Sequence, residues 1–507
     1  MSVPTRGVSL TWLFDGIAPL PATDVQVDDL TLDSREVRPG SLFFALSGTR
    51  SHGLEFAADA AARGASVVLW EPEGAPGVPG TATPVLAASV FAAPVPGLRQ
   101  LLGRIADRFF GWPSSQLRIA GVTGTNGKTT TAYLLAQCLQ RLKSNAAYIG
   151  TIGWGRIDAL QVPTHTTPDV VTVHRQLATL RAAGVRDVAM EVSSHALEQG
   201  RVDGVRFHSA AFTNLTRDHL DYHGSMQAYG AAKARLFAIA GLQHAIINIG
   251  DAFGRELARG HAGRTPLTAV WVGAAASAWL ADCSLFAEEV ILDLEGISLM
   301  LGGSFGKRRV KTHLLGRFNA ENSVIVLACL LALGVTLDDA AMALAESGAP
   351  PGRMEVIASA DRTKPLAVID YAHTPDALSK ALSSLREHCR GALWCVFGCG
   401  GDRDPGKRPM MGAIADELAD QIIVTDDNPR SENPESITEG ILRGIVRHPP
   451  RVIHDRGAAI AAALGEAATN DMVLIAGKGH EDYQIYGDSR RRFSDKSEAL
   501  RHLGAAA

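Results

Sequence analysis

Short apolar runs alternate with amphipathic stretches over most of the chain. The runs are rich in β-branched residues, and each is followed by glycine, polar or charged residues. This pattern predicts buried β-strands over 118–122, 187–191, 367–370, 393–397, 422–425 and 472–476. Strands that alternate with helical patterns predict an α/β protein with parallel sheets, in which ligands bind beyond the carboxyl ends of the strands. Functional groups are therefore expected directly after each run.

Breaks in this alternation divide the chain of 507 residues. Single hydrophobic cores stop growing at about 250–300 residues, so several domains are expected. An Ala-, Pro- and Gly-rich stretch over 75–96 predicts a loop-rich segment late in a first domain, and the sequence G-A-P-P-G at 348–352 predicts a second break. These breaks predict three domains, over 1–112, 113–350 and 351–507.

Composition narrows the class of protein. With 46% hydrophobic and 20% charged residues and no apolar run of about 18 residues, the chain is predicted to be globular and not to insert into membranes. Its N-terminus has no continuous apolar segment followed by a cleavage site, which favours the cytoplasm. A formal charge of −4 gives no drive toward nucleic acid. The six cysteines form no C-x-x-C pair, which disfavours disulfides and structural zinc.

A glycine-rich loop, T-G-T-N-G-K-T-T-T at 123–131, follows the run 118–122 and precedes apolar residues at helical spacing, at 134, 135, 138, 139 and 142. Strand, glycine loop and helix in this order can bind phosphate, because backbone N–H groups at the positive end of the helix face the anion. Lys128 would add a point charge, and the Thr129 hydroxyl would bind Mg²⁺. Val122 stands where the general G-x-x-x-x-G-K-[ST] pattern has glycine, so the loop is a shorter variant. The alternative is a purely structural turn.

Acidic and imidazole side chains follow two further runs. Glu191 ends the run 187–191, and a second contact to Mg²⁺ is usually placed at such a position after a phosphate loop. The polar segment 213–223 carries four titratable groups, at Asp218, His219, Asp221 and His223. Its alternative interpretation is a loop whose side chains satisfy one another.

Seven segments occur together in a fixed order: G-T-N-G-K-T-T (124–130), M-E-V-S-S-H (190–195), N-L-T-R-D-H-L-D-Y-H (214–223), A-A-K-A-R-L-F (231–237), G-R-F-N-A-E-N (316–322), D-Y-A-H-T-P-D-A-L (370–378) and G-C-G-G-D-R-D (398–404). Each alone is weak, but the ordered set resembles the Mur ligases almost from end to end. The resemblance implies three α/β domains. These are an N-terminal domain for a uridine diphosphate moiety, a central P-loop ATPase-like domain and a C-terminal Rossmann-like domain that brings the incoming amino acid.

Lys233 shows what the resemblance adds. It lies among alanines in a helix that Ser225 is predicted to cap, where composition alone predicts a solvated surface lysine. In the Mur ligases a lysine at this position is carbamylated by CO₂, which turns a cation into an anion that helps to hold the second of two Mg²⁺ ions. The resemblance implies catalytic roles for Lys128, Lys233 and His219, and metal binding by Thr129, Glu191, His219 and Lys233 as N6-carboxylysine. It implies ATP contacts at Gly124, Thr125, Asn126, Gly127, Lys128, Thr129, Thr130, Asn319, Arg353, Asp370 and His373.

Two further surfaces resemble those that hold the nucleotide-linked muramyl dipeptide UDP-MurNAc-L-Ala-D-Glu. In the first domain, L-D-S-R (32–35) and S-G-T-R-S-H-G (47–53) are similar to the uridine-diphosphate-binding loops of enzymes that add the third residue. In the second, T-H-T-T-P-D (164–169) and residues of 193–201 offer hydroxyls and one cation, which suit carboxylates and amides. The implied contacts are Leu32, Ser34, Thr49, Arg50, Ser51, His165, Thr166, Thr167, Ser193, Gln199 and Arg201.

The segment D-N-P-R at 427–430 indicates which amino acid is added. An amino acid with a second carboxylate needs a fixed bidentate cation, and the proline before Arg430 restricts the loop that aims its guanidinium. This form resembles the diaminopimelate-adding members, whereas lysine-adding members typically lack the arginine. The structural alternative pairs Arg430 with Asp426 or Glu432. The implied contacts to meso-diaminopimelate are Arg403, Asp427, Asn428, Pro429, Arg430, Gly477 and Glu481, of which Glu481 suits the distal ammonium.

The resemblance implies a two-step reaction. The γ-carboxylate of the D-glutamyl residue attacks the γ-phosphate of ATP, which gives an acyl phosphate and ADP, and the amine of diaminopimelate then displaces phosphate. The largest protein contribution is expected to be electrostatic, from Lys128, Mg²⁺ and the loop N–H groups. The amine needs a base or desolvation, for which His219 and His223 are candidates. The chain is expected to act as a monomer.

Other functions remain alternatives. An L-lysine-adding Mur ligase would keep the family and change the amino acid. A folylpolyglutamate-type ligase would share the P-loop and the domain plan but would have no use for the uridine-binding segment or for D-N-P-R. A P-loop switch or motor would hydrolyse ATP without an acceptor, and no coiled-coil heptad is evident. A ligase-derived binding protein is disfavoured because no expected catalytic position is lost.

Overall fold

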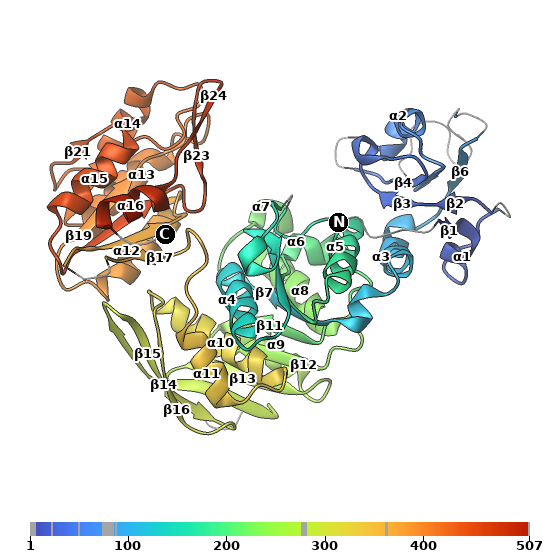
Figure 1. The fold of residues 1–507 in the computed structure, drawn as a ribbon, viewed down its shortest axis with the longest axis horizontal. Helices are drawn as coiled ribbons and strands as arrows, with labels where there is room; N and C mark the ends of the chain where they lie inside the picture. The colour runs from blue at the N-terminus through green and yellow to red at the C-terminus, as the bar shows by residue number, and fades with distance from the viewer. Residues whose placement is uncertain are drawn as a thin grey trace. The chain divides into compact units, whose positions relative to one another are not determined.

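Figure 1 shows a computed structural model of the chain. It describes residues 7–21, 24–48, 51–73, 86, 89–163, 165–274, 281–359 and 363–504. The chain divides into two compact units. The first contains Met1–Lys128, Lys143–Ala245 and Gly263–Pro266, and the second contains Thr129–Leu142, Ile246–Ala262 and Leu267–Ala507.

The first unit begins with a four-stranded sheet in the order β3-β4-β5-β6, in which neighbouring strands are parallel. Its elements are β1 (Val8–Ser9), α1 (Leu10–Phe14), β2 (Gln26–Val27), β3 (Asp29–Thr31), η1 (Ser34–Glu36), β4 (Ser41–Ala45), η2 (Gly53–Phe56), α2 (Ala57–Ala62), β5 (Val67–Trp70), β6 (Phe91–Pro94), α3 (Leu98–Phe109) and η3 (Pro113–Gln116). Strand β4 is buried on both faces, because Leu42 and Phe44 enter one apolar cluster while Phe43 and Ala45 enter another.

Strand β6 corrects the prediction of a loop-rich segment over 75–96. Phe91–Pro94 pairs with β5, whereas residues 74–85, 87 and 88 lie outside the described residues. The Ala- and Pro-rich composition hides this strand. Pro94 ends a strand at the edge of the sheet, where a missing N–H removes no interior ladder bond.

The rest of the first unit contains strands in the order β11-β7-β10-β8-β9, all parallel except β9. Its elements are β7 (Arg118–Thr123), β8 (Ala146–Gly150), β9 (Gly153–Gly155), η4 (Ile157–Ala159), α5 (Val170–Ala182), β10 (Asp187–Glu191), α6 (Ser194–Glu198), β11 (Ser209–Phe212), α7 (Leu220–His223), α8 (Met226–Ala234) and η5 (Arg235–Ala238). The predicted strands 118–122 and 187–191 are confirmed. So is the Ser225 cap of α8, whose Oγ accepts a hydrogen bond from the Ala228 N–H at 3.1 Å.

Parallel pairing brings the carboxyl ends of β7, β10 and β11 to one edge of this sheet. The glycine loop follows β7, Glu191 ends β10, and the polar segment 213–223 follows β11. The motifs that the sequence places after three separate runs therefore meet at one edge.

The second unit contains α4, which lies between β7 and β8 in the sequence, and the elements from β12 to α11. They are α4 (Lys128–Arg141), β12 (His244–Asn248), α9 (Ala252–His261), β13 (Leu267–Val272), β14 (Cys283–Asp293), β15 (Gly296–Gly303), β16 (Arg308–Thr312), α10 (Phe318–Ala332) and α11 (Leu337–Ala345). Helix α4 is the helix predicted after the glycine loop, and its apolar residues Leu134, Leu135, Cys138 and Leu139 are buried. Strand β13 is parallel to β14, and β14, β15 and β16 form an antiparallel meander.

The C-terminal part of the second unit has a six-stranded sheet in the order β17-β18-β22-β19-β20-β21, parallel except for β17. Its elements are β17 (Glu355–Ile357), β18 (Leu366–Asp370), α12 (Pro375–Arg386), β19 (Leu393–Phe397), α13 (Lys407–Leu418), β20 (Gln421–Val424), α14 (Pro434–Leu442), β21 (Arg451–Val452), α15 (Arg456–Glu466), β22 (Met472–Ala476), β23 (Tyr483–Tyr486), β24 (Ser489–Arg492) and α16 (Asp495–Leu503). The four strands predicted here are confirmed to within one residue.

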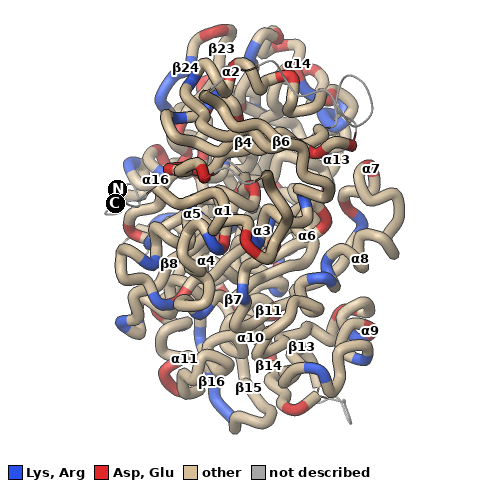
Figure 2. The backbone as a smooth tube through the Cα atoms, turned by 90° about the vertical axis from the view of Figure 1, so that its right-hand side faces the viewer, with Lys and Arg blue, Asp and Glu red and all other residues tan. Residues whose placement is uncertain are grey.

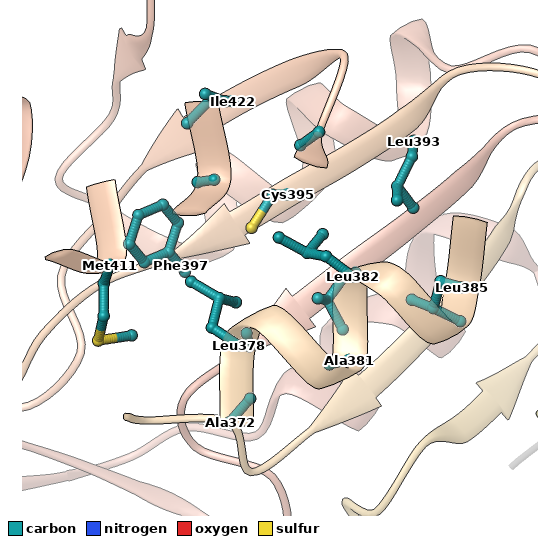
Figure 3. Close-up of a cluster of buried hydrophobic side chains, with 14 of the residues drawn as sticks. Ala372, Leu378, Ala381, Leu382, Leu385, Leu393, Cys395, Phe397, Met411 and Ile422 are labelled. Atoms are coloured by element: carbon teal, nitrogen blue, oxygen red, sulfur yellow. The ribbon is translucent and has the colours of Figure 1, made fainter. Parts of the chain in front are cut away.

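Helices cover both faces of this C-terminal sheet. Figure 3 shows Leu378, Leu382 and Leu385 of α12 beside Cys395 and Phe397 of β19, all in one buried cluster. The alternate β19 residues, Trp394 and Val396, enter a second cluster that includes residues of α15 and α16. A parallel sheet buried on both faces explains why these strands read as continuous apolar runs.

The expected α/β class is observed in both units, while the domain boundaries near 112 and 350 stay a prediction. Over the described part of the chain, no helix has both the length and the apolar character needed to cross a bilayer. Figure 2 shows basic and acidic residues interspersed along the backbone.

Candidate active site

Hydrogen bonds connect the glycine loop to the segment that follows β11. The Thr125 N–H donates to the Asn214 carbonyl at 2.8 Å, and the Thr213 hydroxyl donates to the Asn126 carbonyl at 2.6 Å. Gly124 has a φ of +148°, and a Cβ there would collide with the Thr213 hydroxyl. The loop therefore requires glycine, and it carries the N–H groups of 124–128 toward the start of α4.

Two lysines converge on this loop. Lys128 Nζ donates to the carbonyls of Gly124 and Thr125 at 2.8 and 2.9 Å, and Lys233 Nζ donates to the Gly124 carbonyl at 2.7 Å. Lys233 is only 1% exposed, so the expectation of a solvated surface lysine is wrong. Burial and the nearby Lys128 charge lower the pKa of Lys233 to about 6. At neutral pH its amine is therefore mostly uncharged and nucleophilic.

Glu191 is fully buried at the end of β10. Its carboxylate accepts hydrogen bonds from the Tyr148 hydroxyl, from the Thr151 N–H at 2.9 Å and from the Thr151 hydroxyl at 3.2 Å. These donors are neutral. They orient the carboxylate at the end of the strand.

The two candidate histidines differ in their surroundings. His223 is buried, and its ring nitrogens lie 3.0 Å from the Ser194 hydroxyl and 3.0 Å from Glu198. His219 has a side chain that is 47% exposed and a φ of +51°, and its Nε2 lies 3.5 Å from Asp218. The interpretation of 213–223 as a self-satisfied polar loop therefore suits His223, which ties α7 to α6. His219 is the more accessible imidazole.

Three of the residues expected to hold the muramyl dipeptide, Thr167, Gln199 and Arg201, form one hydrogen-bonded chain. The Thr167 hydroxyl donates to the Glu191 carbonyl at 2.9 Å, and Arg201 Nη1 donates to the Thr167 carbonyl at 2.9 Å. Arg201 also donates to the Gln199 side-chain oxygen at 2.7 Å, and the Gln199 side-chain nitrogen donates to the Tyr222 hydroxyl at 2.9 Å. Tyr222 is a member that sequence reasoning missed.

The remaining residues that are expected to contact this substrate also belong to the first unit. The Ser193 hydroxyl caps α6, Thr166 lies 3.1 Å from the Thr151 hydroxyl, and His165 is exposed. In the N-terminal sheet, Leu32 and Ser34 follow β3, and the Ser51 carbonyl accepts from the Gly48 N–H at 3.0 Å. Thr49 and Arg50 lie outside the described residues.

Besides Thr129 and Thr130 at the start of α4, four expected ATP contacts belong to the second unit. Asn319 is 1% exposed and donates to the Leu315 carbonyl at 2.7 Å, so it is held inside the start of α10. Asp370 ends β18 and accepts from the Met354 N–H at 2.8 Å, and burial raises its pKa to about 6. The Arg353 guanidinium lies 5.2 Å from the Tyr371 ring centre. His373 Nδ1 lies 2.8 Å from the Tyr371 carbonyl, so Arg353, Asp370 and His373 gather around one turn.

Arg430 is not paired as the structural alternative proposed. Glu432 binds Arg408 at 2.8 Å, and Asp426 binds His454 at 2.9 Å. Arg430 Nη1 donates to the Gly401 carbonyl at 2.7 Å, and among the described residues its guanidinium forms no ion pair. That alternative is wrong, and the guanidinium retains donors for an anion.

The other residues expected to hold diaminopimelate surround a buried lysine. Lys478 is 0% exposed and donates to the Asn428 side-chain oxygen at 3.3 Å and to Glu481 at 3.2 Å. The Asn428 amide donates to Glu481 at 3.0 Å, and Asp427 lies 4.0 Å from Lys478. Gly477 has a φ of +117°, and a Cβ there would lie 2.5 Å from Asp427. The segments 427–430 and 477–481 thus form one cluster, beside which Pro429 is buried and Arg403 is exposed.

Comparison with known proteins covers nearly the whole chain. The Mur ligase family, catalytic domain matches residues 26–110, the Mur ligase middle domain matches 122–330, and the Mur ligase, glutamate ligase domain matches 352–479. A relative from Ectopseudomonas mendocina (strain ymp) is 48% identical over 96% of this chain and 97% of its own. The chain belongs to the Mur ligase family.

Two further comparisons agree with this Mur ligase assignment. A relative from Xanthomonas campestris pv. campestris (strain 8004) is 49% identical over 98% of both chains, and like the first it is named UDP-N-acetylmuramoyl-L-alanyl-D-glutamate--2,6-diaminopimelate ligase. A solved structure of a ligase of that name is 35% identical, with a TM-score of 0.73, and covers 98% of this chain and 99% of its own. The three-domain α/β fold and the ATP-dependent ligase class expected from the sequence are those of the Mur ligases.

Sequence reasoning missed several residues of this Mur ligase that hold others in place. They are Tyr148, Thr151, Tyr222, Lys478, Gln484 and Tyr486. Lys478, Gln484 and Tyr486 lie within eight residues of Glu481, so their proximity in sequence was a usable signal. The contacts of Tyr148 and Tyr222 join segments 23 to 43 residues apart, and no local pattern marks them.

Proposed function

We propose that this chain joins meso-diaminopimelate to UDP-N-acetylmuramoyl-L-alanyl-D-glutamate at the expense of ATP, in peptidoglycan precursor synthesis. The observation that carries the choice of amino acid is the Arg430 guanidinium, which has no ion-pair partner among the described residues and lies in the loop that also carries Asn428. The names of the relatives support both substrates. L-lysine, the alternative amino acid, has no second carboxylate for this guanidinium to bind.

The chemistry follows from the need to activate a carboxylate. The γ-carboxylate oxygen of the D-glutamyl residue attacks the γ-phosphorus of ATP, and the bond to ADP breaks, which leaves an acyl phosphate. The amine of diaminopimelate attacks the acyl carbon, loses a proton, and inorganic phosphate departs. Negative charge accumulates in both steps, so Lys128 and the loop N–H groups of 124–128 are proposed to stabilise the transition states.

We propose that two Mg²⁺ ions assist, held by Thr129, Glu191, His219 and the carbamate of Lys233. When bound, Mg²⁺ neutralises charge on the transferring phosphoryl group. The residues fit such ions, because hydrogen bonds from Tyr148 and Thr151 orient the Glu191 carboxylate and the His219 side chain is accessible. Lys233 fits carbamylation, in which its amine nitrogen adds to the carbon of CO₂ and releases a proton, because the reaction requires the uncharged amine.

The amino-acid site supports recognition of both ends of diaminopimelate. Arg430 is proposed to bind the distal carboxylate in a bidentate manner, and Glu481 to bind the distal ammonium. Asn428 and Lys478 already contact Glu481, so its carboxylate is oriented before substrate arrives. We further propose that the enzyme works in the cytoplasm, where ATP is available, and that it acts as a monomer.

The test measures phosphate release from ATP with the UDP-linked dipeptide and meso-diaminopimelate, L-lysine or no amino acid. Release should require the dipeptide and prefer diaminopimelate by 10²-fold or more, on the order of one lost bidentate charge pair. Arg430→Met should remove most of this preference, while Arg443→Met, which replaces an exposed arginine directly after α14, should keep it. A preference for lysine would overturn the choice of amino acid, and release that needs no dipeptide would favour a switch or motor.

A further inference from the structure

The backbone of Arg430 adopts an unfavourable conformation that a distant hairpin holds in place. Its φ of +54° is in the left-handed region, which costs a non-glycine residue on the order of 1 kcal/mol or more. The hairpin of β23 and β24 bonds both backbone groups of this residue. The Arg430 N–H donates to the Ile485 carbonyl at 3.0 Å, and the Gly487 N–H donates to the Arg430 carbonyl at 2.7 Å.

The same hairpin fixes the residues that precede Arg430. Gln484 is 7% exposed, and its amide nitrogen donates to two consecutive carbonyls, those of Asp426 at 3.2 Å and of Asp427 at 3.0 Å. The Tyr486 hydroxyl donates to the Asp426 carboxylate at 3.1 Å. Each bond reaches across 57 to 60 residues of sequence.

One of these contacts also decides how Asn428 faces the site. The Ile485 N–H donates to the Asn428 side-chain oxygen at 3.0 Å, so the amide nitrogen of Asn428 must point the other way, toward Glu481 at 3.0 Å. The hairpin therefore sets the orientation of both polar groups, Asn428 and Arg430, that the loop offers to an amino acid.

We infer that Gln484 and Tyr486 are positioning residues that determine amino-acid specificity, because they lock the loop 426–430 in the one conformation that aims the Arg430 guanidinium. This inference rests on the proposed function and deepens it. The physical basis is preorganisation of the loop. Without the two hydrogen bonds from Gln484 to backbone carbonyls, the strained backbone of Arg430 can relax, and its guanidinium is no longer held where a second carboxylate would bind.

The inference distinguishes acceptors by what they lack. Binding of an acceptor with a distal carboxylate depends on the orientation of the Arg430 guanidinium, whereas L-lysine has no distal carboxylate for this guanidinium to bind. A more mobile loop should therefore weaken the binding of diaminopimelate and leave the binding of lysine almost unchanged. A variant that merely damaged the fold would weaken every substrate alike.

The experiment compares Gln484→Met with the unaltered enzyme. Methionine keeps the length of the side chain and removes the donor. We expect the KM for diaminopimelate to rise about 10- to 30-fold, as loss of two hydrogen bonds allows, with the KM for ATP and for the dipeptide within about twofold. The ratio of kcat/KM for diaminopimelate over that for lysine should fall by about the same factor. Arg492→Gln, on the exposed strand β24, is the matched control and should change nothing.

Each outcome has a separate meaning. If the unaltered enzyme shows no preference for diaminopimelate, the proposed function fails. If it shows the preference and Gln484→Met keeps the ratio, the inference alone is overturned. If Gln484→Met does not fold, as its melting temperature would show, Tyr486→Phe decides. Loss of its single hydroxyl contact should lower the ratio about threefold, and an unchanged ratio would overturn the inference.

Discussion

Lys233 in the first unit and Lys478 in the second are both buried lysines, 1% and 0% exposed, with opposite surroundings. Lys233 donates to a carbonyl and has a second lysine nearby, and over the described chain no carboxylate lies within ion-pair distance of it. Lys478 lies 3.2 Å from Glu481 and 4.0 Å from Asp427. The first environment favours an uncharged, reactive amine, whereas the second places two carboxylates around the lysine.

Other buried groups repeat this contrast. In the first unit, Asp107 and His174 lie 3.5 Å apart, and burial raises the pKa of Asp107 to about 6 and lowers that of His174 to about 4. In the second unit, Arg456 and Asp495 are fully buried and joined at 2.7 and 2.8 Å. A buried titratable group is thus either neutralised or paired, and its partners decide which.

The largest expected effect is on catalysis. Lys233→Met should lower kcat by on the order of 10³, because the variant cannot form the proposed carbamate and loses the charge that is proposed to hold metal. Phosphate release measures the rate. In parallel, ¹³C-labelled bicarbonate should give a carbamate signal in the NMR spectrum of the unaltered enzyme and none in the variant. A variant that keeps its rate would show that Lys233 is not part of the machinery.

Replacing the other lysine should damage stability instead. Lys478→Met leaves Asp427 and Glu481 without their buried cation, so the free energy of unfolding should fall by about 3 kcal/mol. Urea denaturation measures this change. Lys380→Met, which removes an exposed ion pair to Asp376, should change it by less than about 0.5 kcal/mol. Equal effects of the two substitutions would contradict the contrast.

The Asp107–His174 pair predicts a pH dependence that one substitution uncovers. Between pH 4 and 6 the unfolded chain binds a proton at His174 that the folded chain does not, while the folded chain binds one at Asp107 that the unfolded chain does not, so the two effects cancel. Asp107→Asn removes the second effect. The free energy of unfolding should then fall, relative to the unaltered protein, by up to about 1.4 kcal/mol per pH unit as pH falls through this range.

His174→Gln should give the opposite slope, because only the raised pKa of Asp107 remains. Its free energy of unfolding should increase relative to the unaltered protein as pH falls from 6 toward 4. Denaturation curves at several pH values measure both slopes. Parallel curves for all three proteins would show that neither group is neutral when folded.

The smallest effect is the stability of Lys233→Met. The substitution removes one hydrogen bond to the Gly124 carbonyl and replaces a desolvated amine with an apolar side chain of similar length. The two changes oppose each other, so the free energy of unfolding should change by less than about 1 kcal/mol. A loss as large as that of Lys478→Met would mean that Lys233 is charged and paired in the folded protein.

The strands and the phosphate loop could be predicted because their signals are local. An apolar run buried on both faces, such as 393–397, can be recognised from its own residues, and so can the helix that starts at Lys128. Strand β6 was missed because alanine and proline, which are uncommon in strands, make up most of it. The burial of Lys233 was missed because its hydrogen-bond partner, the Gly124 carbonyl, lies 109 residues away in the sequence, and alanines around a lysine do not reveal what packs on them.

The same limit applies to the candidate site. D-N-P-R marked the loop, but the bonds that fix it come from Gln484 and Tyr486, whose alternation along β23 looks like that of an ordinary edge hairpin. Hydrogen bonds between distant segments depend on the register of folded elements, and no spacing within one segment encodes that register.

The link between the loop 426–430 and the β23–β24 hairpin has a consequence for the history and redesign of such enzymes. The residues proposed to recognise the amino acid and the residues that hold them in place are encoded in separate parts of the gene. Transplanting the five loop residues into a ligase with another preference would move the guanidinium without its support. A successful exchange of specificity would need both segments to be inherited together.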